Sequence, residues 1–135
     1  MKDMKNDTKT TDHNTKKLIR DTLLALGIAP HVKGFAHLED VFKILLSNKE
    51  HLYAIHKEVY FQVAKLHNTT PNRVERCIRH AKEDAEWGTP LWNELFQYVG
   101  PDQRNTNAYF FARVLMYLEE TLAGRDDGGE RVAGE

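Results

Sequence analysis

The amino-acid sequence predicts an all-α protein: a compact six-helix domain that contains a helix-turn-helix, formed by its third and fourth helices. Apolar residues recur at helical spacing in six segments, and no stretch shows the alternation typical of a β-strand. Residues that begin or end helices, such as Thr-Pro pairs and glycines, separate these segments. A length of 135 residues is enough for one domain with its own core.

The predicted domain spans residues 15–122. Residues 1–14 are polar and lack apolar periodicity, so we predict a disordered N-terminal tail, and residues 123–135 are predicted to form a disordered, acidic, Gly-rich tail. No apolar run approaches the roughly 18 residues that a membrane span needs, and the polar start does not fit a signal peptide. Because Cys77 is the only cysteine, it cannot form an internal disulfide, and we expect a cytoplasmic protein without a membrane partner.

The first three helices are predicted from their apolar stripes. The first ends at Gly27, and the second contains Phe35 and Phe42 on its inner face. Ser47 and Glu50 stand at capping-box spacing and are predicted to begin the third helix. The predicted inner stripe of the third helix consists of Leu52, Ile55, Val59, Val63 and Leu66.

The last three helices begin with recognisable caps. Thr70 is predicted to cap the fourth helix, with Pro71 in its first position, where the missing backbone N–H is not needed. Thr89 begins a short fifth helix in the same way, and the sixth runs from about residue 106 to residue 122. We expect at least one of the two tryptophans beside the fifth helix to pack in the core.

The third and fourth helices meet the requirements of a helix-turn-helix. A very short turn joins them, and Ala64 supplies the small residue that a steep crossing needs. Asn68 stands where the turn needs a residue that tolerates positive φ. The apolar stripe of the fourth helix consists of Val74, Ile78, Ala81 and Ala85.

The outer face of the fourth helix, residues 71–86, predicts the function. Arg73 and Arg76 lie one turn apart near the N-terminal end, which enters the major groove of DNA in this motif. An arginine side chain matches guanine O6 and N7, and Glu75 can either accept from cytosine N4 or hold an arginine in place. The alternative interpretation is an ordinary solvated amphipathic helix.

Other polar residues of this helix are expected to contact phosphates. Arg79, His80 and Lys82 lie further along the helix, where the DNA backbone is the expected target. The sequence thus predicts a sequence-specific DNA-binding transcription regulator whose main partner is double-stranded DNA.

The charge distribution agrees with a DNA partner although the net charge is −1. Residues 51–82 carry six Lys and Arg against two Asp and Glu, whereas residues 83–135 carry four Arg against eleven Asp and Glu. A nearly neutral chain can therefore present one basic face to an anion. We expect the basic segment to face DNA and the acidic one to face away.

Other patterns predict no further chemistry. The seven His lack metal-ligand spacing and no Cys pair occurs, so we expect no metal and no cofactor. Cys77 is expected to be a small buried hydrophobe rather than a nucleophile. His31 and Lys33 precede the second helix, where they either bind a phosphate or form a simple turn. The sequence contains no Gly-rich phosphate loop, serine elbow or catalytic carboxylate pair, so an enzyme is not expected.

The sequence also resembles a known family. Residues 68–81 (NTTPNRVERCIRHA) are similar to the recognition-helix signature of the C-terminal DNA-binding effector domain of the stage-zero sporulation master response regulator, the sporulation initiation transcription factor. Residues 26–34 and residues 57–65 resemble other parts of that domain, and the resemblance covers nearly all of residues 15–122.

The resemblance implies a six-helix fold that reads a short GC-containing DNA box, with two copies on adjacent sites. It implies base contacts by Arg73, Glu75 and Arg76. The expected contacts to the DNA backbone are by Thr70, Asn72, Arg79, His80 and Lys82.

The resemblance further implies contact with RNA polymerase sigma factor through Thr89, Trp92 and Phe96. The sequence departs from the family pattern at Phe61 and over residues 86–90. No receiver domain precedes the module in this sequence, so phosphorylation-triggered dimerisation is not expected within the chain. The alternative function is a receiver-less protein-interaction module that titrates sigma factor, RNA polymerase or a full-length relative through its acidic half.

Overall fold

The computed structural model describes the backbone of residues 2–97 and 106–134, and the side chains of residues 13–97 and 106–125. Over these residues all regular secondary structure is helical, which confirms the predicted all-α fold with six α-helices. In chain order the elements are α1 (Lys2–Ala25), α2 (Lys33–Ser47), the 3₁₀ helix η1 (Lys49–Ala54), the π-helix η2 (Ile55–Tyr60), α3 (Phe61–Leu66), α4 (Pro71–Glu83), α5 (Pro90–Phe96) and α6 (Asn107–Gly134).

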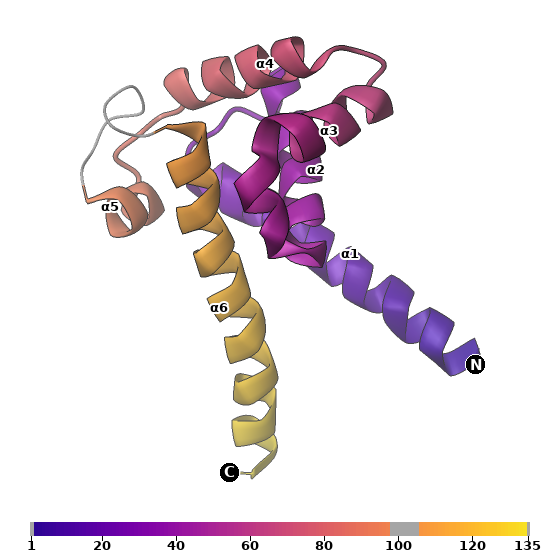
Figure 1. Ribbon diagram of the computed structural model, residues 1–135. Helices are drawn as coiled ribbons and strands as arrows, with labels where there is room; N and C mark the ends of the chain where they lie inside the picture. Colours follow the sequence, from indigo (N-terminus) through magenta and orange to yellow (C-terminus); the bar gives the residue numbers. More distant parts are fainter. Residues whose placement is uncertain (1, 98–105, 135) are drawn as a thin grey trace.

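The helices are arranged around α2, which packs against α1, η1, η2, α3, α4 and α6. Figure 1 shows α4 lying across one end of the molecule, while α1 and α6 diverge toward the other end. Both chain termini therefore lie far from α4. The outer side of α4 thus forms the surface at one end of the molecule, away from the two termini.

The core is built from apolar side chains of every α-helix. Phe42 of α2 meets Phe111 of α6 edge-on, with ring centroids 5.8 Å apart. Phe96 of α5 stacks on Phe110 of α6 at 5.5 Å, and Trp92 lies beside both rings. These contacts join α5 and α6 to α2, on which α4 is mounted.

The third predicted helix is divided into η1, η2 and α3, and it differs from the expectation in two further details. Asn48, and not Ser47, caps its first turn, because the Asn48 side chain accepts from the Glu50 N–H at 3.0 Å while Ser47 Oγ donates to the Ile44 carbonyl. Leu66 is 69% exposed, so its place in the inner stripe is wrong. The adjacent residues Val63 and Ala64 are both buried, and a helical face centred between them does not include Leu66.

The two terminal helices extend into the segments where the sequence predicts tails. The backbone is helical over residues 2–14 and 123–134, which differs from the irregular chain expected there. These turns project beyond the body of the molecule (Figure 1). The division into one domain with two tails stays a prediction. Among the described helices, none combines the length and the apolar character that crossing a membrane requires.

Candidate nucleic-acid interface

The helix-turn-helix predicted from the sequence is present in α3 and α4. Asn68 adopts a φ of 53° in the turn, the left-handed conformation expected of it. Ala64 is buried, and its carbonyl accepts from the Thr69 N–H at 2.9 Å, which closes the turn. The turn thereby directs α4 across the end of the molecule (Figure 1).

The N-terminus of α4 is fixed by its cap. Thr70 has an extended backbone, and its Oγ1 accepts from the Arg73 N–H at 3.2 Å. Pro71 occupies the first helical position, as predicted. Thr70 therefore orients the first turn of α4, and its contact with a DNA phosphate stays a prediction.

The inner face of α4 is held tightly against α2. Val74, Ile78 and Ala81 are buried, as predicted. At Gly34 of α2, a Cβ atom would lie 2.3 Å from the backbone oxygen of Cys77, closer than any real contact. Only glycine fits there, so the backbones of α2 and α4 lie in direct contact at this point.

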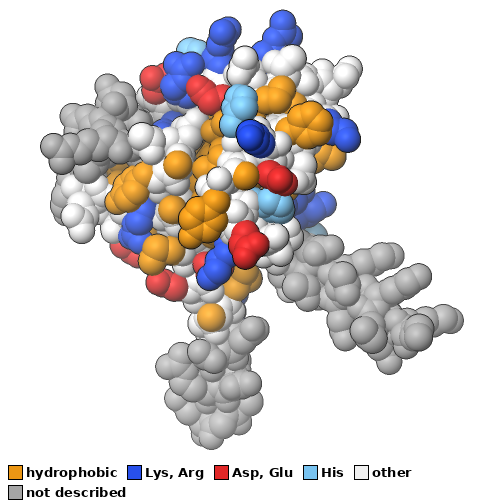
Figure 2. Space-filling model, viewed as in Figure 1, with side chains coloured by type: hydrophobic (Ala, Val, Ile, Leu, Met, Phe, Trp, Pro, Cys, Tyr) orange, Lys and Arg blue, Asp and Glu red, His pale blue; other side chains and the backbone are white. Residues whose placement is uncertain are grey.

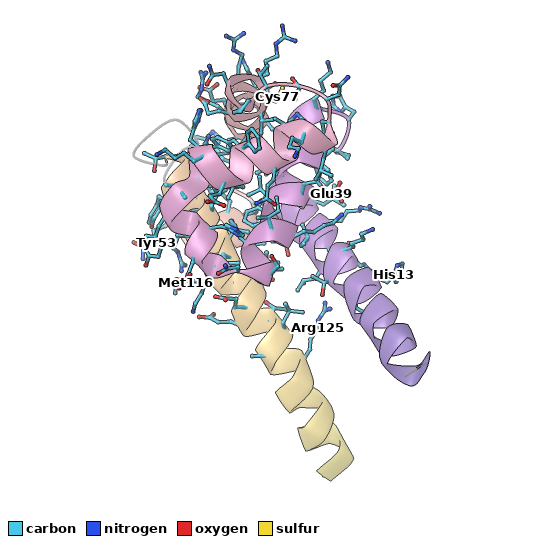
Figure 3. The ribbon with its side chains drawn as sticks, turned by 45° about the vertical axis from the view of Figure 1, so that its right-hand side comes forward. His13, Glu39, Tyr53, Cys77, Met116 and Arg125 are labelled. Atoms are coloured by element: carbon cyan, nitrogen blue, oxygen red, sulfur yellow. The ribbon has the colours of Figure 1, made fainter. Side chains whose placement is uncertain are left out.

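The outer face of α4 gathers most of the predicted DNA-contacting residues. The exposed side chains are Asn72, Arg73, Arg76, Arg79 and His80. Figure 2 shows Lys and Arg side chains along the edge that α4 forms, and Figure 3 shows nitrogen-tipped side chains radiating from α4. The arrangement suits an elongated anion that lies along this edge.

Glu75 lies between these arginines and holds one of them. Its two carboxylate oxygens accept from Arg79 Nε at 3.2 and 3.3 Å, one helical turn away. Of the two roles left open by the sequence, the structure shows the one in which Glu75 fixes an arginine. Its contact with a base stays a prediction. Because both side chains are partly exposed, the pair adds little stability and mainly sets the orientation of Arg79.

The prediction that Lys82 contacts the DNA backbone is wrong. Lys82 is only 3% exposed, and its Nζ donates to Asn107 Oδ1 at 3.0 Å and lies 5.3 Å from the centre of the Phe110 ring. Burial lowers the pKa of Lys82 to about 8. Its position could have been recognised, since Lys82 follows Val74 and Ile78 at intervals of four residues along the inner stripe.

Lys82 belongs to a polar network that the sequence analysis missed. Asn107 of α6 also donates from its Nδ2 to the Tyr60 hydroxyl at 3.1 Å. Burial raises the pKa of Tyr60 to about 12. No local spacing could reveal this network, because its members lie 25 and 47 residues apart. It ties the C-terminal half of α4 to η2 and α6.

The expectation that Trp92 and Phe96 contact a partner is also wrong for this fold. Trp92 is fully buried and Phe96 is 2% exposed, because both pack on Phe110. Thr89 caps α5 by accepting from the Trp92 N–H at 3.2 Å, and it donates to the Ala25 carbonyl at 2.7 Å. Trp92 confirms that one tryptophan packs in the core, whereas Trp87 is 52% exposed.

The expectations about metal ions and about Cys77 concern the side chains of residues 13–97 and 106–125. Within them, no three His, Cys, Asp or Glu side chains are placed to hold a metal ion. Cys77 is free and partly buried, on the side of α4 that faces α2.

A comparison with known families finds a match that covers the whole helix-turn-helix. A family model described as "Sporulation initiation factor Spo0A C terminal" matches residues 19–118. The matched range contains α2, α3, α4 and α5 and most of the core-forming part of α1 and α6.

Proposed function

The chain belongs to the family of the sporulation initiation factor Spo0A C-terminal domain, a family of helical DNA-binding domains, and we propose that it is a transcription regulator that reads a specific double-stranded DNA sequence with α4. Its place of action would then be the cytoplasm, where bacterial DNA lies.

The observation that carries this proposal is the exposed face of α4. Arg73 and Arg76 are exposed one turn apart, on the N-terminal half of a helix that a tight α2 contact holds in place. Among the described side chains, no ion pair engages either of them, whereas Glu75 engages Arg79. Two arginines in this setting can each bind a guanine edge in the major groove.

The remaining exposed residues of α4 would position the helix on the duplex. Thr70, Asn72, Arg79 and His80 are exposed, and with α4 in the groove they would meet the sugar-phosphate backbone. Contacts of these four residues with phosphates add affinity without selecting sequence.

We propose that two copies bind adjacent sites on a GC-containing box, as family membership suggests.

The test is DNA affinity at fixed salt, for the box that the protein itself selects in vitro and for unrelated DNA. Replacing Arg76 by Ala should weaken binding to the selected box roughly 10- to 100-fold and reduce its advantage over unrelated DNA. Arg125→Ala, on the distant part of α6 (Figure 3), is the matched control and should leave both affinities unchanged. Undiminished affinity and selectivity of Arg76→Ala would refute base reading by α4.

A second candidate function is a protein-interaction module that titrates sigma factor or RNA polymerase. The observation that favours it is exposed Trp87, which follows the acidic residues Glu83, Asp84 and Glu86. Tight capture of purified polymerase, abolished by Trp87→Ala and combined with only millimolar DNA affinity, would favour this function over DNA reading.

A further inference from the structure

A cavity of about 570 Å³ lies beside the recognition surface, between the start of α2, the helix-turn-helix turn and the first half of α4. Its basic lining residues are Lys33, His37, His67, Arg73 and Arg76, and it has no acidic lining residue. Two of the five also belong to the outer face of α4. The cavity therefore continues the recognition surface onto α2.

Asp40 of α2, the carboxylate that pairs with the lining residue His67, is already engaged. One of its oxygens pairs with His67 Nε2, and the other lies 3.7 Å from the Lys43 ammonium. Asp40 therefore orients His67 and is not among the residues that line the cavity. The positive charge of Lys33 and the two arginines remains available to an anion.

The start of α2 adds to the attraction for an anion. Lys33 is the first residue of this 15-residue helix, and Val32 before it makes no side-chain cap. The first turn of α2 also contains no acidic residue. The N-terminal N–H groups of a helix carry a partial positive charge and favour a phosphate as acceptor.

His37 adds an unsatisfied polar atom beside the cavity. It is 5% exposed and lines the cavity, yet its Nδ1 is buried without a hydrogen-bond partner among the described residues. A buried polar atom without a partner is destabilising, so such positions in proteins call for an explanation. Burial is the main cause that lowers the pKa of His37, and the second is the His67 ring, whose centroid lies 4.5 Å from that of His37.

We propose that this cavity binds a phosphate group, held by Lys33, the start of α2 and the paired imidazoles of His37 and His67. The inference rests on the proposed function for its expected source, a phosphate of the DNA backbone. The cavity is larger than a lone oxyanion requires and opens beside Arg73 and Arg76, so a sugar-phosphate strand fits its position. A free phosphate ester would use the same groups.

The first experiment measures phosphate binding without DNA. Inorganic phosphate is titrated into the protein at constant ionic strength while NMR follows the imidazole signals of His37 and His67, with His13 of α1 (Figure 3) as the control. Both cavity signals should shift and saturate, and the pKa of His37 should rise, because an anion favours the charged form. The His13 signal should stay in place, and Lys33→Gln should weaken the shift severalfold.

The second experiment identifies the source of the phosphate. If it is DNA, Lys33→Gln should reduce the slope of log affinity against log salt by about 0.9 and weaken cognate and unrelated DNA alike, roughly eightfold at 0.1 M salt. Lys49→Gln, on exposed η1, removes the same charge elsewhere and should change neither quantity. A phosphate-induced shift combined with an unchanged DNA slope would assign the site to a free phosphate ester.

The proposal is overturned if neither phosphate nor DNA moves the His37 and His67 signals. That failure differs from a failure of the proposed function, which appears as unaltered sequence preference in Arg76→Ala. Saturating phosphate shifts in a protein that does not bind DNA would refute the function and retain the phosphate site.

Discussion

The helices α4 and α5 begin with the same kind of cap, but α4 exposes its functional side chains and α5 buries its large ones. Each starts with a Thr-Pro pair whose threonine Oγ1 accepts from the N–H three residues later at 3.2 Å. Yet α4 lies on the surface and exposes its arginines, while α5 buries Trp92 and Phe96 against α6. Local sequence therefore determines where a helix begins, and tertiary packing determines which of its side chains can meet a partner.

The largest change in the free energy of unfolding is expected from a substitution on the buried side of α5. Trp92→Ala removes a fully buried ring between Phe96 and Phe110 and should lower the free energy of unfolding by about 3–5 kcal/mol. Exposed Trp87→Ala is the control, with a change within about 0.5 kcal/mol. Denaturant unfolding of both variants measures the difference. A Trp92→Ala variant of unchanged stability would contradict the assignment of Trp92 to the core.

The next largest effect is a dependence of stability on pH, caused by Lys82, which is buried on the inner side of α4. Its pKa is about 8 in the fold and near the ordinary 10.5 when unfolded, so below pH 8 both states hold the proton and the penalty of burying the charge is fully present. Between pH 8 and pH 10 the unfolded state binds more protons, and the free energy of unfolding should rise by roughly 2–3 kcal/mol.

Above pH 10 the Tyr60 hydroxyl acts in the opposite direction. Its pKa is raised to about 12, so the unfolded state loses this proton first and stability falls as pH rises further. Urea unfolding across pH 7–10 measures the Lys82 effect, and Lys82→Met should remove the rise. An equal rise in the variant would show that another group causes it.

The smallest effect compares the two caps directly. Thr70→Ala loses one cap bond and should destabilise the protein by about 1 kcal/mol. Thr89→Ala also loses the bond to the Ala25 carbonyl and should cost about 2 kcal/mol. The matching serine variants keep both kinds of bond and should recover most of the stability in thermal unfolding. Equal losses for the two alanine variants would mean that the Ala25 bond contributes nothing.

The features that were predictable from the sequence depend on neighbouring residues. Asn68 and Thr70 act within four residues of their own positions, and the apolar stripe of α4 correctly assigned Arg73 and Arg76 to its outer face. The charge of Lys82 suggests an outward position, whereas its spacing from Val74 and Ile78 predicts an inward one. Spacing was the better guide, because the inner face of a helix is set by geometry.

The features that were not predictable depend on distant partners. The burial of Trp92 and Phe96 follows from Phe110, which comes from another helix. Side chains of α2, of the turn and of α4 together line the cavity beside α4, and the close approach of α2 at Gly34 to the backbone of α4 follows from no local pattern. Such contacts appear only once the chain is folded.

The central claim is that the exposed arginines of α4 read bases, and in vitro selection of DNA tests it most directly. Wild type, Arg76→Ala and Arg79→Ala each select from a random duplex library at one stated salt concentration. We expect wild type and Arg79→Ala to select the same GC-containing box, and Arg76→Ala to lose its preference at one base pair within it. If Arg76→Ala selects the same box with the same preference at every position, α4 does not read DNA through this arginine.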